Sequence, residues 1–362
     1  MSDVEMIEKP TGRQAAAAAT GPLPGGHPPV LPRRIGVVLL NLGTPDATDY
    51  WSMRRYLGEF LSDKRVIDYP AWLWQPLLQL VILTKRPFTS GAAYRAIWNT
   101  ERDESPLRTV TRSQALKLAA RFADRHPDVT VDWAMRYGNP SIRSVLDRMA
   151  AAGCDRIALM ALYPQYAAPT TATAYDKAFE ALMTMRRQPA IRTMGPYHDD
   201  PRYIELLARS IERHLATLDW QPQRLIMSYH GVPKRFLMSG DPYHCMCHKT
   251  TRLVRERLGW DEERVMTCFQ SRFGREEWLQ PYFDQTLERL PKEGMKKIAV
   301  ISPAFVTDCV ETLEEIDQEG RGDFLAAGGE KFTYIPCLND DDAHIDFLAV
   351  LAEREIRGWV PG

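Results

Sequence analysis

Long apolar runs are missing from this chain of 362 residues. No uninterrupted run reaches the roughly 18–20 residues that a membrane-spanning helix needs, which argues against an integral membrane protein. An excess of one charge is missing too, because Lys and Arg total 46, Asp and Glu total 47, and no large block carries one sign. Nucleic-acid-binding proteins usually show a basic patch or stripe, so we expect no nucleic-acid partner.

Cysteine is scarce, and a secretion signal is not visible. Six cysteines in a chain of this length do not form the disulfide framework of a small secreted protein. Residues 1–33 contain the short alanine run Ala15–Ala19 and then a stretch rich in Gly and Pro, so we expect a disordered leader there. We therefore expect a cytoplasmic protein.

One segment, 69–86, approaches membrane character. It combines tryptophans at 72 and 74 with many aliphatic residues and ends in Lys85 and Arg86. This composition suits a segment that dips into a membrane interface, and it also suits a buried amphipathic helix. Composition favours the buried helix slightly.

Short apolar runs rich in β-branched residues alternate with helical patterns along the chain. This alternation predicts an α/β protein in which helices cover both faces of parallel sheets. The expected strands are 35–41, 129–134, 156–162, 224–229, 264–269 and 297–302. The expected helices are 50–61, 107–125, 141–152, 175–187, 201–217, 247–258, 278–290 and 342–356.

The two halves of the chain resemble each other. Each contains a strand, an Arg-aromatic-Gly motif (Arg136 in the first half, Arg272 in the second), a helix ending at Gly, and a strand ending at Pro. We therefore predict two similar domains, 34–197 with the segment 69–86 as its lip, and 198–358. Ligands would bind in the cleft between them.

His230 lies where such a fold performs chemistry. An apolar strand ends at Tyr229, and Gly231 and Pro233 stop it directly after the histidine. Ligands of open parallel sheets bind outside the carboxyl ends of the strands, and histidine both titrates near neutral pH and binds metals. A structural histidine in a tight turn is the competing interpretation.

An acidic stripe follows the strand at 297–302. Asp308 is a candidate helix cap, and Glu311 and Glu315 follow at i+3 and i+7, on one face of the expected helix. Carboxylates without intervening Lys or Arg suit cation binding or proton transfer, although helix dipoles also favour acidic first turns. Opposed to His230, such a stripe would bind a divalent metal or accept protons.

Together these segments resemble the ferrochelatases, the terminal enzymes of haem synthesis, and most closely their proteobacterial branch. The matching segments run in order over nearly the whole chain after the leader. They are LNLGTPD at 40–46, YPQY at 163–166, SYHGVP at 228–233, GDPY at 240–243, FQSRFG at 269–274 and FVTDCVETLEEI at 305–316.

The resemblance implies the chelatase fold, α/β with two Rossmann-like domains. Each would have a parallel sheet of the four-stranded type flanked by helices, with a porphyrin cleft between the domains. The reaction would be insertion of Fe²⁺ into protoporphyrin IX with release of two protons, by a lyase that needs no cofactor beyond the substrate iron. The lip 69–86 would face the inner-membrane surface, so that the cytoplasmic protein would associate peripherally with the membrane.

The resemblance also implies residue roles. His230 would be the catalytic histidine, as proton acceptor or metal ligand, and Glu311 its carboxylate partner across the cleft. Arg136 and Tyr137 would be catalytic residues on the opposite face. The metal-binding positions would be His230, Glu311, Glu315 and Asp308. Leu42 and Trp278 would touch the macrocycle, and Arg86, Tyr94 and Ser105 its propionates.

A [2Fe–2S] cluster, which some relatives bind, is not expected. Ala167 and Ala168 stand where the family places one cysteine ligand, and the C-terminus has no cysteine-rich tail. The ligand-dense run His244-Cys-Met-Cys-His248 leaves another metal site open.

Other functions remain as alternatives. A coproporphyrin III ferrochelatase or a cobalt chelatase of corrin synthesis would need to bind more carboxylates, and the single clear propionate arginine, Arg86, favours protoporphyrin. A non-catalytic tetrapyrrole- or metal-binding protein is the alternative from another class. Retention of His230, Glu311, Arg136 and Tyr137 together argues against it.

Overall fold

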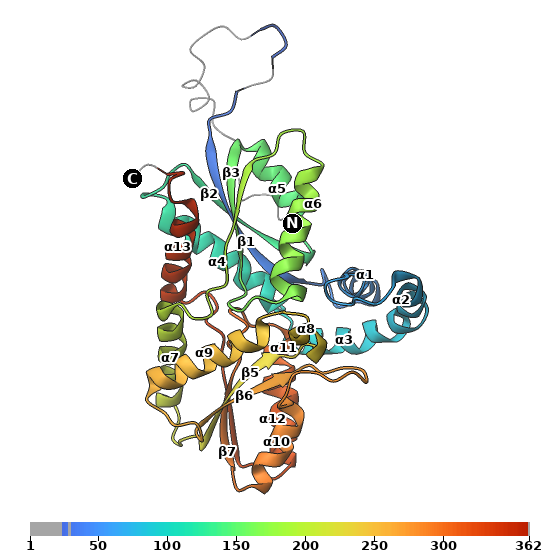
Figure 1. Cartoon of the computed structure of the whole chain (residues 1–362), viewed down its shortest axis with the longest axis vertical. Helices are drawn as coiled ribbons and strands as arrows, with labels where there is room; N and C mark the ends of the chain where they lie inside the picture. Colours follow the sequence, from blue (N-terminus) through green and yellow to red (C-terminus); the bar gives the residue numbers. More distant parts are fainter. Residues whose placement is uncertain (1–23, 28–29, 361–362) are drawn as a thin grey trace.

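The computed structural model describes residues 24–27 and 30–360, so most of the expected leader 1–33 lies outside the described residues. Two parallel four-stranded sheets, one in each half of the chain, form the described part (Figure 1). The predicted α/β class is therefore confirmed. The strands are β1 (Arg34–Thr44), β2 (Val129–Gly138), β3 (Cys154–Ala161), β4 (Ala190–Thr193), β5 (Arg224–His230), β6 (Val265–Gln270), β7 (Lys297–Ile301) and β8 (Lys331–Ile335).

The two sheets share one topology, as the repeated motifs predict. Their strand orders are β2-β1-β3-β4 and β6-β5-β7-β8, and every neighbouring pair is parallel. All six strands expected from the sequence are present. The edge strands β4 and β8 were not expected. They are only four and five residues long, so their sequences show little periodicity.

Helices cover the sheets, and polar caps define where several of them begin. Asp49 accepts hydrogen bonds from the backbone of α1, and Asp200 caps α7 just before Pro201. The predicted helix 278–290 begins only at Phe283. The helices are α1 (Tyr50–Leu61), α2 (Ala71–Leu77), η2 (Leu78–Ile82), α3 (Leu83–Ile97), α4 (Pro106–Phe122), α5 (Ile142–Ala151), η3 (Ala168–Ala172), α6 (Thr173–Met183), α7 (Pro201–Ala216), α8 (Lys234–Met238), α9 (Tyr243–Leu258), α10 (Phe283–Lys292), α11 (Val310–Leu313), η4 (Glu315–Gly320), α12 (Arg321–Ala326) and α13 (Asp342–Ile356), the η segments being π-helices.

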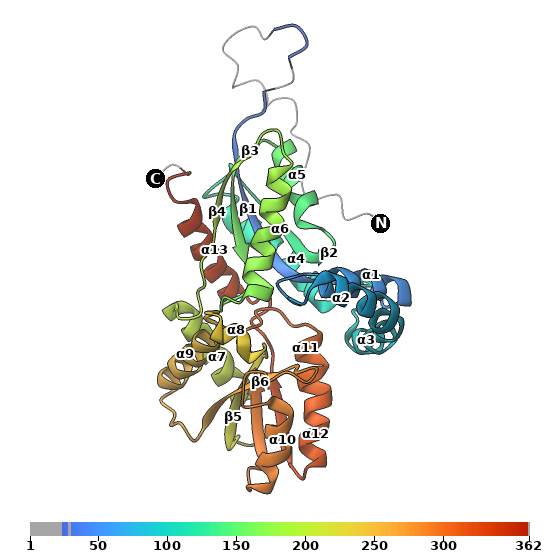
Figure 2. The same cartoon turned by 45° about the vertical axis from the view of Figure 1, so that its right-hand side comes forward.

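The first half carries a helical projection that has no counterpart in the second half. Helices α1, α2 and α3 stand out sideways near the junction of the two sheets, in Figure 1 and again in Figure 2. Their inner side packs around Met53, Leu57 and Leu83, with Tyr137 from the end of β2. Val310 of α11 packs against the same cluster, so the projection contacts the second half as well.

The C-terminal helix crosses between the halves. Helix α13 packs against α4 and β3 of the first half, as well as α7. The main hydrophobic core is continuous through both halves, including Leu39 from β1 and Leu225 from β5. The domain boundaries 34–197 and 198–358 stay a prediction.

Candidate active site

His230 ends the strand β5, at the point where the second sheet changes its winding direction. In the order β6-β5-β7-β8, the chain leaves β5 toward one edge and later returns to β7 on the other side. Ligands of such sheets bind outside the carboxyl ends of the strands at this switch point. Helix α11, which carries Glu311, follows β7, so the switch point has His230 on one side and an acidic segment on the other.

The ring of His230 is oriented by its own turn. Nδ1 lies 2.6 Å from the carbonyl oxygen of Gly231, which makes Nδ1 the donor, and none of the residues that the structure describes forms a hydrogen bond with Nε2. Gly231 is needed here, because a Cβ atom would lie 2.7 Å from the carbonyl oxygen of Gln270 and 3.1 Å from the Trp278 ring. The turn therefore presents a free imidazole nitrogen next to a tryptophan.

Gln270 joins the histidine strand to the acidic segment. It pairs with His230 across β5 and β6, and its carbonyl oxygen accepts from the Gly231 amide at 2.8 Å. Its side chain is buried, and Nε2 donates to the carbonyl oxygen of Glu311 at 2.8 Å and to the Glu315 carboxylate at 3.1 Å. Its Oε1 accepts from the hydroxyl of Ser228 at 2.7 Å. Through its backbone and its side chain, Gln270 thus joins the turn after His230 to Glu311 and Glu315.

Glu315 sits in an environment that favours its neutral form. Burial raises the pKa of Glu315 above its ordinary value, and the nearby charge of Glu311 raises it further. The Ser271 hydroxyl, which donates at 2.6 Å, the charge of His230 and the Gln270 amide act in the opposite direction without cancelling the rise in pKa. Glu315 lies close enough to His230 and Glu311 to interact with their charges, and its raised pKa suits it to take up a proton.

Glu311 faces the first half of the molecule. Its charge contributes to the raised pKa values of Tyr56 and Tyr94, which burial raises most, and to that of the buried Cys309 thiol. Tyr56 and Tyr94 belong to α1 and α3, and their hydroxyls lie 3.5 Å apart. The carboxylate is therefore placed where the projection meets the second half.

The acidic stripe does not form the single helical face expected from its spacing. Cys309, not Asp308, is the N-cap, and α11 gives way to the π-helix η4 at Glu315. The Asp308 carboxylate is buried and accepts from the Tyr334 hydroxyl at 2.7 Å, the Thr312 hydroxyl at 3.0 Å and the Asn339 amide at 2.6 Å. These bonds fix the loop before α11, and a metal-binding role for Asp308 stays a prediction.

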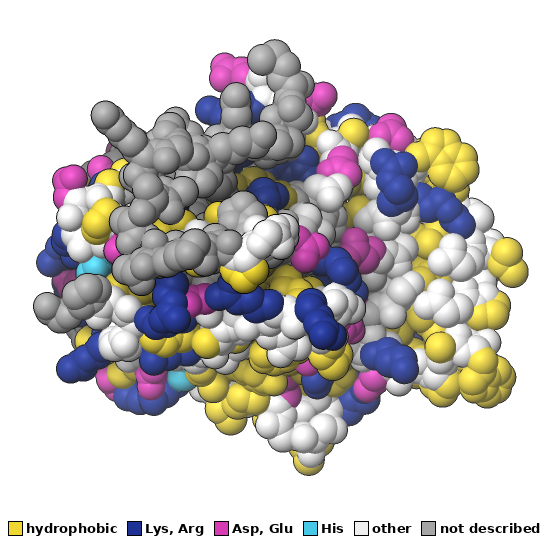
Figure 3. Space-filling view, turned by 90° about the horizontal axis from the view of Figure 1, so that it is seen from above, with side chains coloured by type: hydrophobic (Ala, Val, Ile, Leu, Met, Phe, Trp, Pro, Cys, Tyr) yellow, Lys and Arg dark blue, Asp and Glu magenta, His cyan; other side chains and the backbone are white. Residues whose placement is uncertain are grey.

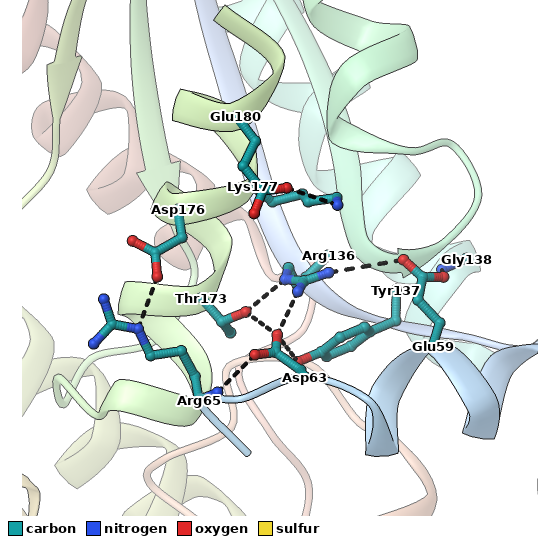
Figure 4. Close-up of polar contacts among 10 residues, drawn as sticks. All are labelled: Glu59, Asp63, Arg65, Arg136, Tyr137, Gly138, Thr173, Asp176, Lys177 and Glu180. Atoms are coloured by element: carbon teal, nitrogen blue, oxygen red, sulfur yellow. Dashed lines mark hydrogen bonds and ion pairs between the residues drawn. The ribbon is translucent and has the colours of Figure 1, made fainter. Parts of the chain in front are cut away.

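Arg136 and Tyr137 form a second polar cluster, at the end of β2 (Figure 4). The Arg136 guanidinium is paired with Asp63, donates to the Thr173 hydroxyl at 2.6 Å and lies 4.2 Å over the Tyr137 ring. The Tyr137 hydroxyl also donates to Asp63, at 2.8 Å. Burial raises the pKa of Asp63, but hydrogen bonds from the Thr173 hydroxyl, the Arg65 amide and the Tyr137 hydroxyl, together with the charge of Arg136, lower it below its ordinary value.

The Arg136 side chain borders an open pocket of about 770 Å³. The end of α1 and the first turns of α6 form its walls, which carry charges of both signs (Figure 4). The charged side chains on these walls are Glu59, Asp63, Lys64, Arg65, Arg136, Asp176, Lys177 and Glu180. The pocket therefore offers charged groups at the carboxyl end of β2.

The expected substrate-binding residues differ in their surroundings. Leu42 is half-buried and packs on the cluster around Tyr137, and Trp278 is buried beside Gly231. Ser105 is buried and caps α4, accepting from the Arg108 amide at 3.3 Å, so its hydroxyl already has a partner. Tyr94 is buried as well.

Arg86 reaches across from the projection toward Trp278. Its guanidinium lies 5.9 Å from the centre of the Phe273 ring, which meets Trp278 edge to face at 5.5 Å. Within residues 24–27 and 30–360, no carboxylate pairs with Arg86, in contrast to Arg136 and Arg108. The Arg86 residue as a whole is exposed, but the protein atoms that partly bury its guanidinium lower the pKa of that group.

Several anchoring residues were not anticipated from the sequence. Gln270 and Ser271 hold Glu315, while Asp63 and Thr173 hold Arg136. Only Gln270 and Ser271 could have been found from the sequence, because both belong to the motif FQSRFG at 269–274.

All six cysteines are free thiols, and five are buried. Among the residues that the structure describes, no three His, Cys, Asp or Glu side chains gather closely enough to hold a metal ion, and no cluster-binding group of cysteines is seen. Searching the same residues for a helix long and apolar enough to cross a membrane finds none.

Comparison with known proteins gives a consistent result. Residues 34–356 match the family described as Ferrochelatase. A ferrochelatase of Rhodobacter capsulatus is 62% identical over 93% of this chain and 97% of that protein, and one of Agrobacterium fabrum is 59% identical over 93% and 98%. The structure described as SirB from Bacillus subtilis with Fe³⁺ aligns with a TM-score of 0.52 at 12% identity, covering 90% of this chain and 98% of that one, and supports the fold alone.

Proposed function

This chain belongs to the ferrochelatase family, enzymes that insert Fe²⁺ into protoporphyrin IX as the last step of haem synthesis, and from that premise we propose how its side chains perform the reaction. His230 and Glu311 form the catalytic pair. The observation that carries this proposal is the bridging position of Gln270, which ties the turn after His230 to Glu311 and Glu315.

His230 accepts the pyrrole protons. Metal insertion into the macrocycle releases two protons, so a base must stand beside the ring nitrogens. The Nε2 atom of His230 is free for this task, because Nδ1 is engaged by the carbonyl oxygen of Gly231 at 2.6 Å. Glu311, from across the switch point, supplies the negative charge that stabilises the resulting imidazolium.

Glu315 is the next proton acceptor. Its raised pKa brings its proton affinity closer to that of an imidazole, so transfer from His230 to Glu315 is less unfavourable than transfer to an ordinary carboxylate. Asp308 takes no part in this path, because both of its carboxylate oxygens accept hydrogen bonds from neighbouring side chains.

Arg136 and Tyr137 act on the opposite face of the porphyrin. Asp63 holds both side chains through one carboxylate, which fixes their positions before substrate arrives. The charged pocket beside them offers Fe²⁺, the metal substrate, several carboxylates on its approach.

Binding of the macrocycle relies on apolar contact and on one cation. A flat porphyrin presents no lone pair to an incoming metal, so it must bend, and the strain must be offset by binding energy elsewhere on the ring. Leu42 and Trp278 supply apolar surface. Arg86 lacks a carboxylate partner in the described structure and is free to bind a propionate through two hydrogen bonds.

The lip 69–86 binds the inner-membrane surface of a cytoplasmic enzyme. Trp72, Leu73 and Leu80 are 76%, 54% and 74% exposed, and Lys85 and Arg86 follow them in the chain. Exposed tryptophan and leucine beside basic residues suit the interface of an anionic bilayer. Protoporphyrin dissolves poorly in water, so this contact would deliver the substrate directly from the membrane.

Anaerobic turnover tests the catalytic proposal. Protoporphyrin IX fluorescence should fall with time in the presence of the enzyme and Fe²⁺, and His230→Ala should slow this by about 10²–10⁴-fold, the usual contribution of a general base. His214→Ala is the matched control, since His214 contacts Thr333 in the second half, away from the switch point. Equal turnover in the His230→Ala protein would refute the proposed base.

A further inference from the structure

The first two turns of α9 carry a pair of histidines that the proposed reaction does not use. His244 and His248 are four residues apart, and this spacing places both side chains on one face of a helix. Their ring centres lie 4.4 Å apart. His244 is half-buried and His248 is exposed, so the pair is open to solvent on one side.

The two rings share one support. Phe269, which is buried at the end of β6, lies under both, with ring centres 5.9 Å from His244 and 6.0 Å from His248. Within the described part of the chain, no carboxylate, hydroxyl or carbonyl group forms a hydrogen bond with either imidazole. The rings are thus positioned by packing while their nitrogen atoms remain free.

This arrangement matches the geometry of a metal chelate. Imidazoles at i and i+4 of a helix form the two-histidine half of known zinc sites. Two nitrogen ligands at about 2.0–2.1 Å from one Zn²⁺, at tetrahedral angles, place the two ring centres about 5 Å apart. The observed separation of 4.4 Å is slightly shorter than this, so the rings move apart when both bind the ion.

We propose that His244 and His248 form a second metal site, which binds a divalent transition ion of the Zn²⁺ type separately from His230. Water completes the coordination, because no third His, Cys, Asp or Glu of the described residues joins the pair. The site is therefore open and exchangeable, unlike a closed structural zinc site. It lies beside the catalytic region, since Phe269 immediately precedes Gln270.

Calorimetric titration of the full chain with Zn²⁺ tests the site. His230→Ala protein is the parent, so that binding at the proposed catalytic histidine does not contribute. We expect one equivalent of Zn²⁺ to bind, and His244→Ala or His248→Ala to weaken it at least ten-fold. The control is His214→Ala, which removes one histidine that contacts Thr333 and not the pair, and it should bind Zn²⁺ as tightly as the parent.

Two results would overturn the proposal. One is the parent's Zn²⁺ affinity in the His244→Ala or the His248→Ala variant, and the other is an equal loss of affinity in the His214→Ala control. His248→Asn repeats the test if the alanine variant unfolds, as judged by circular dichroism. Electron paramagnetic resonance of bound Cu²⁺ should also show two nitrogen ligands in the parent and one in each single variant.

Discussion

Glu315 shows how single side chains adjust a site. It is held by two neutral donors, the Gln270 amide and the Ser271 hydroxyl, and no guanidinium or ammonium group neutralises it within the described residues. Its pKa is therefore raised, mainly because burial penalises the charge. A buried carboxylate that is more stable when protonated is suited to accept a proton. It also makes the free energy of unfolding depend on pH.

The free energy of unfolding should reveal this dependence. The folded-state pKa of Glu315 lies above its ordinary value of 4.5, so the folded protein binds this proton more tightly than the unfolded chain. The contribution is complete below pH 4.5 and is lost as pH rises through the raised pKa, by at most about 1.4 kcal/mol per pH unit. We expect urea unfolding of Glu315→Gln to lack this loss.

Glu319 provides the control for that experiment. It lies in the same π-helix η4 and is exposed, so Glu319→Gln should follow the pH profile of the unchanged protein. Parallel profiles for Glu315→Gln and the unchanged protein between pH 4.5 and neutrality would contradict the raised pKa.

For single residues, the sequence pointed to candidate reacting groups but not to the side chains that anchor them. His230 stood out as a candidate because a strand ends there. Asp63 did not, because it lies 73 positions from its partner Arg136, and no local pattern links two such distant segments. The single acidic face expected from Asp308 to Glu315 is absent, because the spacing i, i+3, i+7 defines one face only along a continuous α-helix. Cys309 is the N-cap in place of Asp308, and the chain changes to a π-helix at Glu315.

The helical projection shows what an element adds. In a water-soluble surface helix, large apolar side chains usually point inward, yet α2 has no buried residue at all. The side chains of α2 and η2 that face solvent include Trp72, Leu73, Leu77, Leu80 and Val81. Figure 3 shows hydrophobic side chains along the right-hand edge of the molecule, the side on which the projection stands out in Figure 1.

The exposure of this element contradicts one of two sequence-based interpretations. Composition slightly favoured a buried amphipathic helix for the segment 69–86, whereas its apolar side chains lie outside. Composition could not settle the question, because tryptophan and leucine serve equally in cores and at interfaces. Which face meets protein is determined by the cluster that α1 and α3 form, in which Leu78 and Leu83 are buried and Trp74 and Ile82 are partly buried.

Vesicle flotation tests the membrane contact. Replacing Trp72 and Leu80 with serine should weaken binding to vesicles containing anionic lipid by about ten- to thirty-fold, because each partly inserted side chain contributes about 1 kcal/mol. Met183→Ser is the matched control, since Met183 on α6 is 74% exposed, like Leu80, but lies outside the lip. Equal loss in both proteins, or no loss in either, would argue against the lip as the binding surface.

The whole molecule is held together by its returning C-terminal segment. Helix α13 follows the last strand of the second sheet and packs against α4 and β3 of the first half (Figure 1). Apolar residues from both halves share the main core, so the halves are not independent in their packing. The internal repeat predicts the two similar sheets correctly. It does not predict where α13 packs, because the pattern within one repeat contains no information about which half a later helix contacts.

Arg192 locks this segment onto the first sheet. From the edge strand β4, its Nη1 donates to the carbonyl oxygens of Glu355 at 2.6 Å and Arg357 at 2.8 Å. The same guanidinium lies 4.2 Å from the centre of the Trp359 ring. Arg156 of β3 adds a bond to the Trp359 carbonyl oxygen at 3.2 Å.

Arg192→Ala should loosen the connection between the halves. We expect the free energy of unfolding to fall by about 1–3 kcal/mol, because two carbonyl groups lose a charged donor and the indole loses its cation. Amide hydrogen exchange should become faster in α13, while β5 and β7 keep their protection until the whole chain unfolds. Arg187→Ala, an exposed change just before the same strand, should leave both measurements unchanged. If Arg192→Ala unfolds at the same urea concentration and with the same exchange pattern as the parent, the contact is incidental, and packing of α13 on α4 alone holds the halves together.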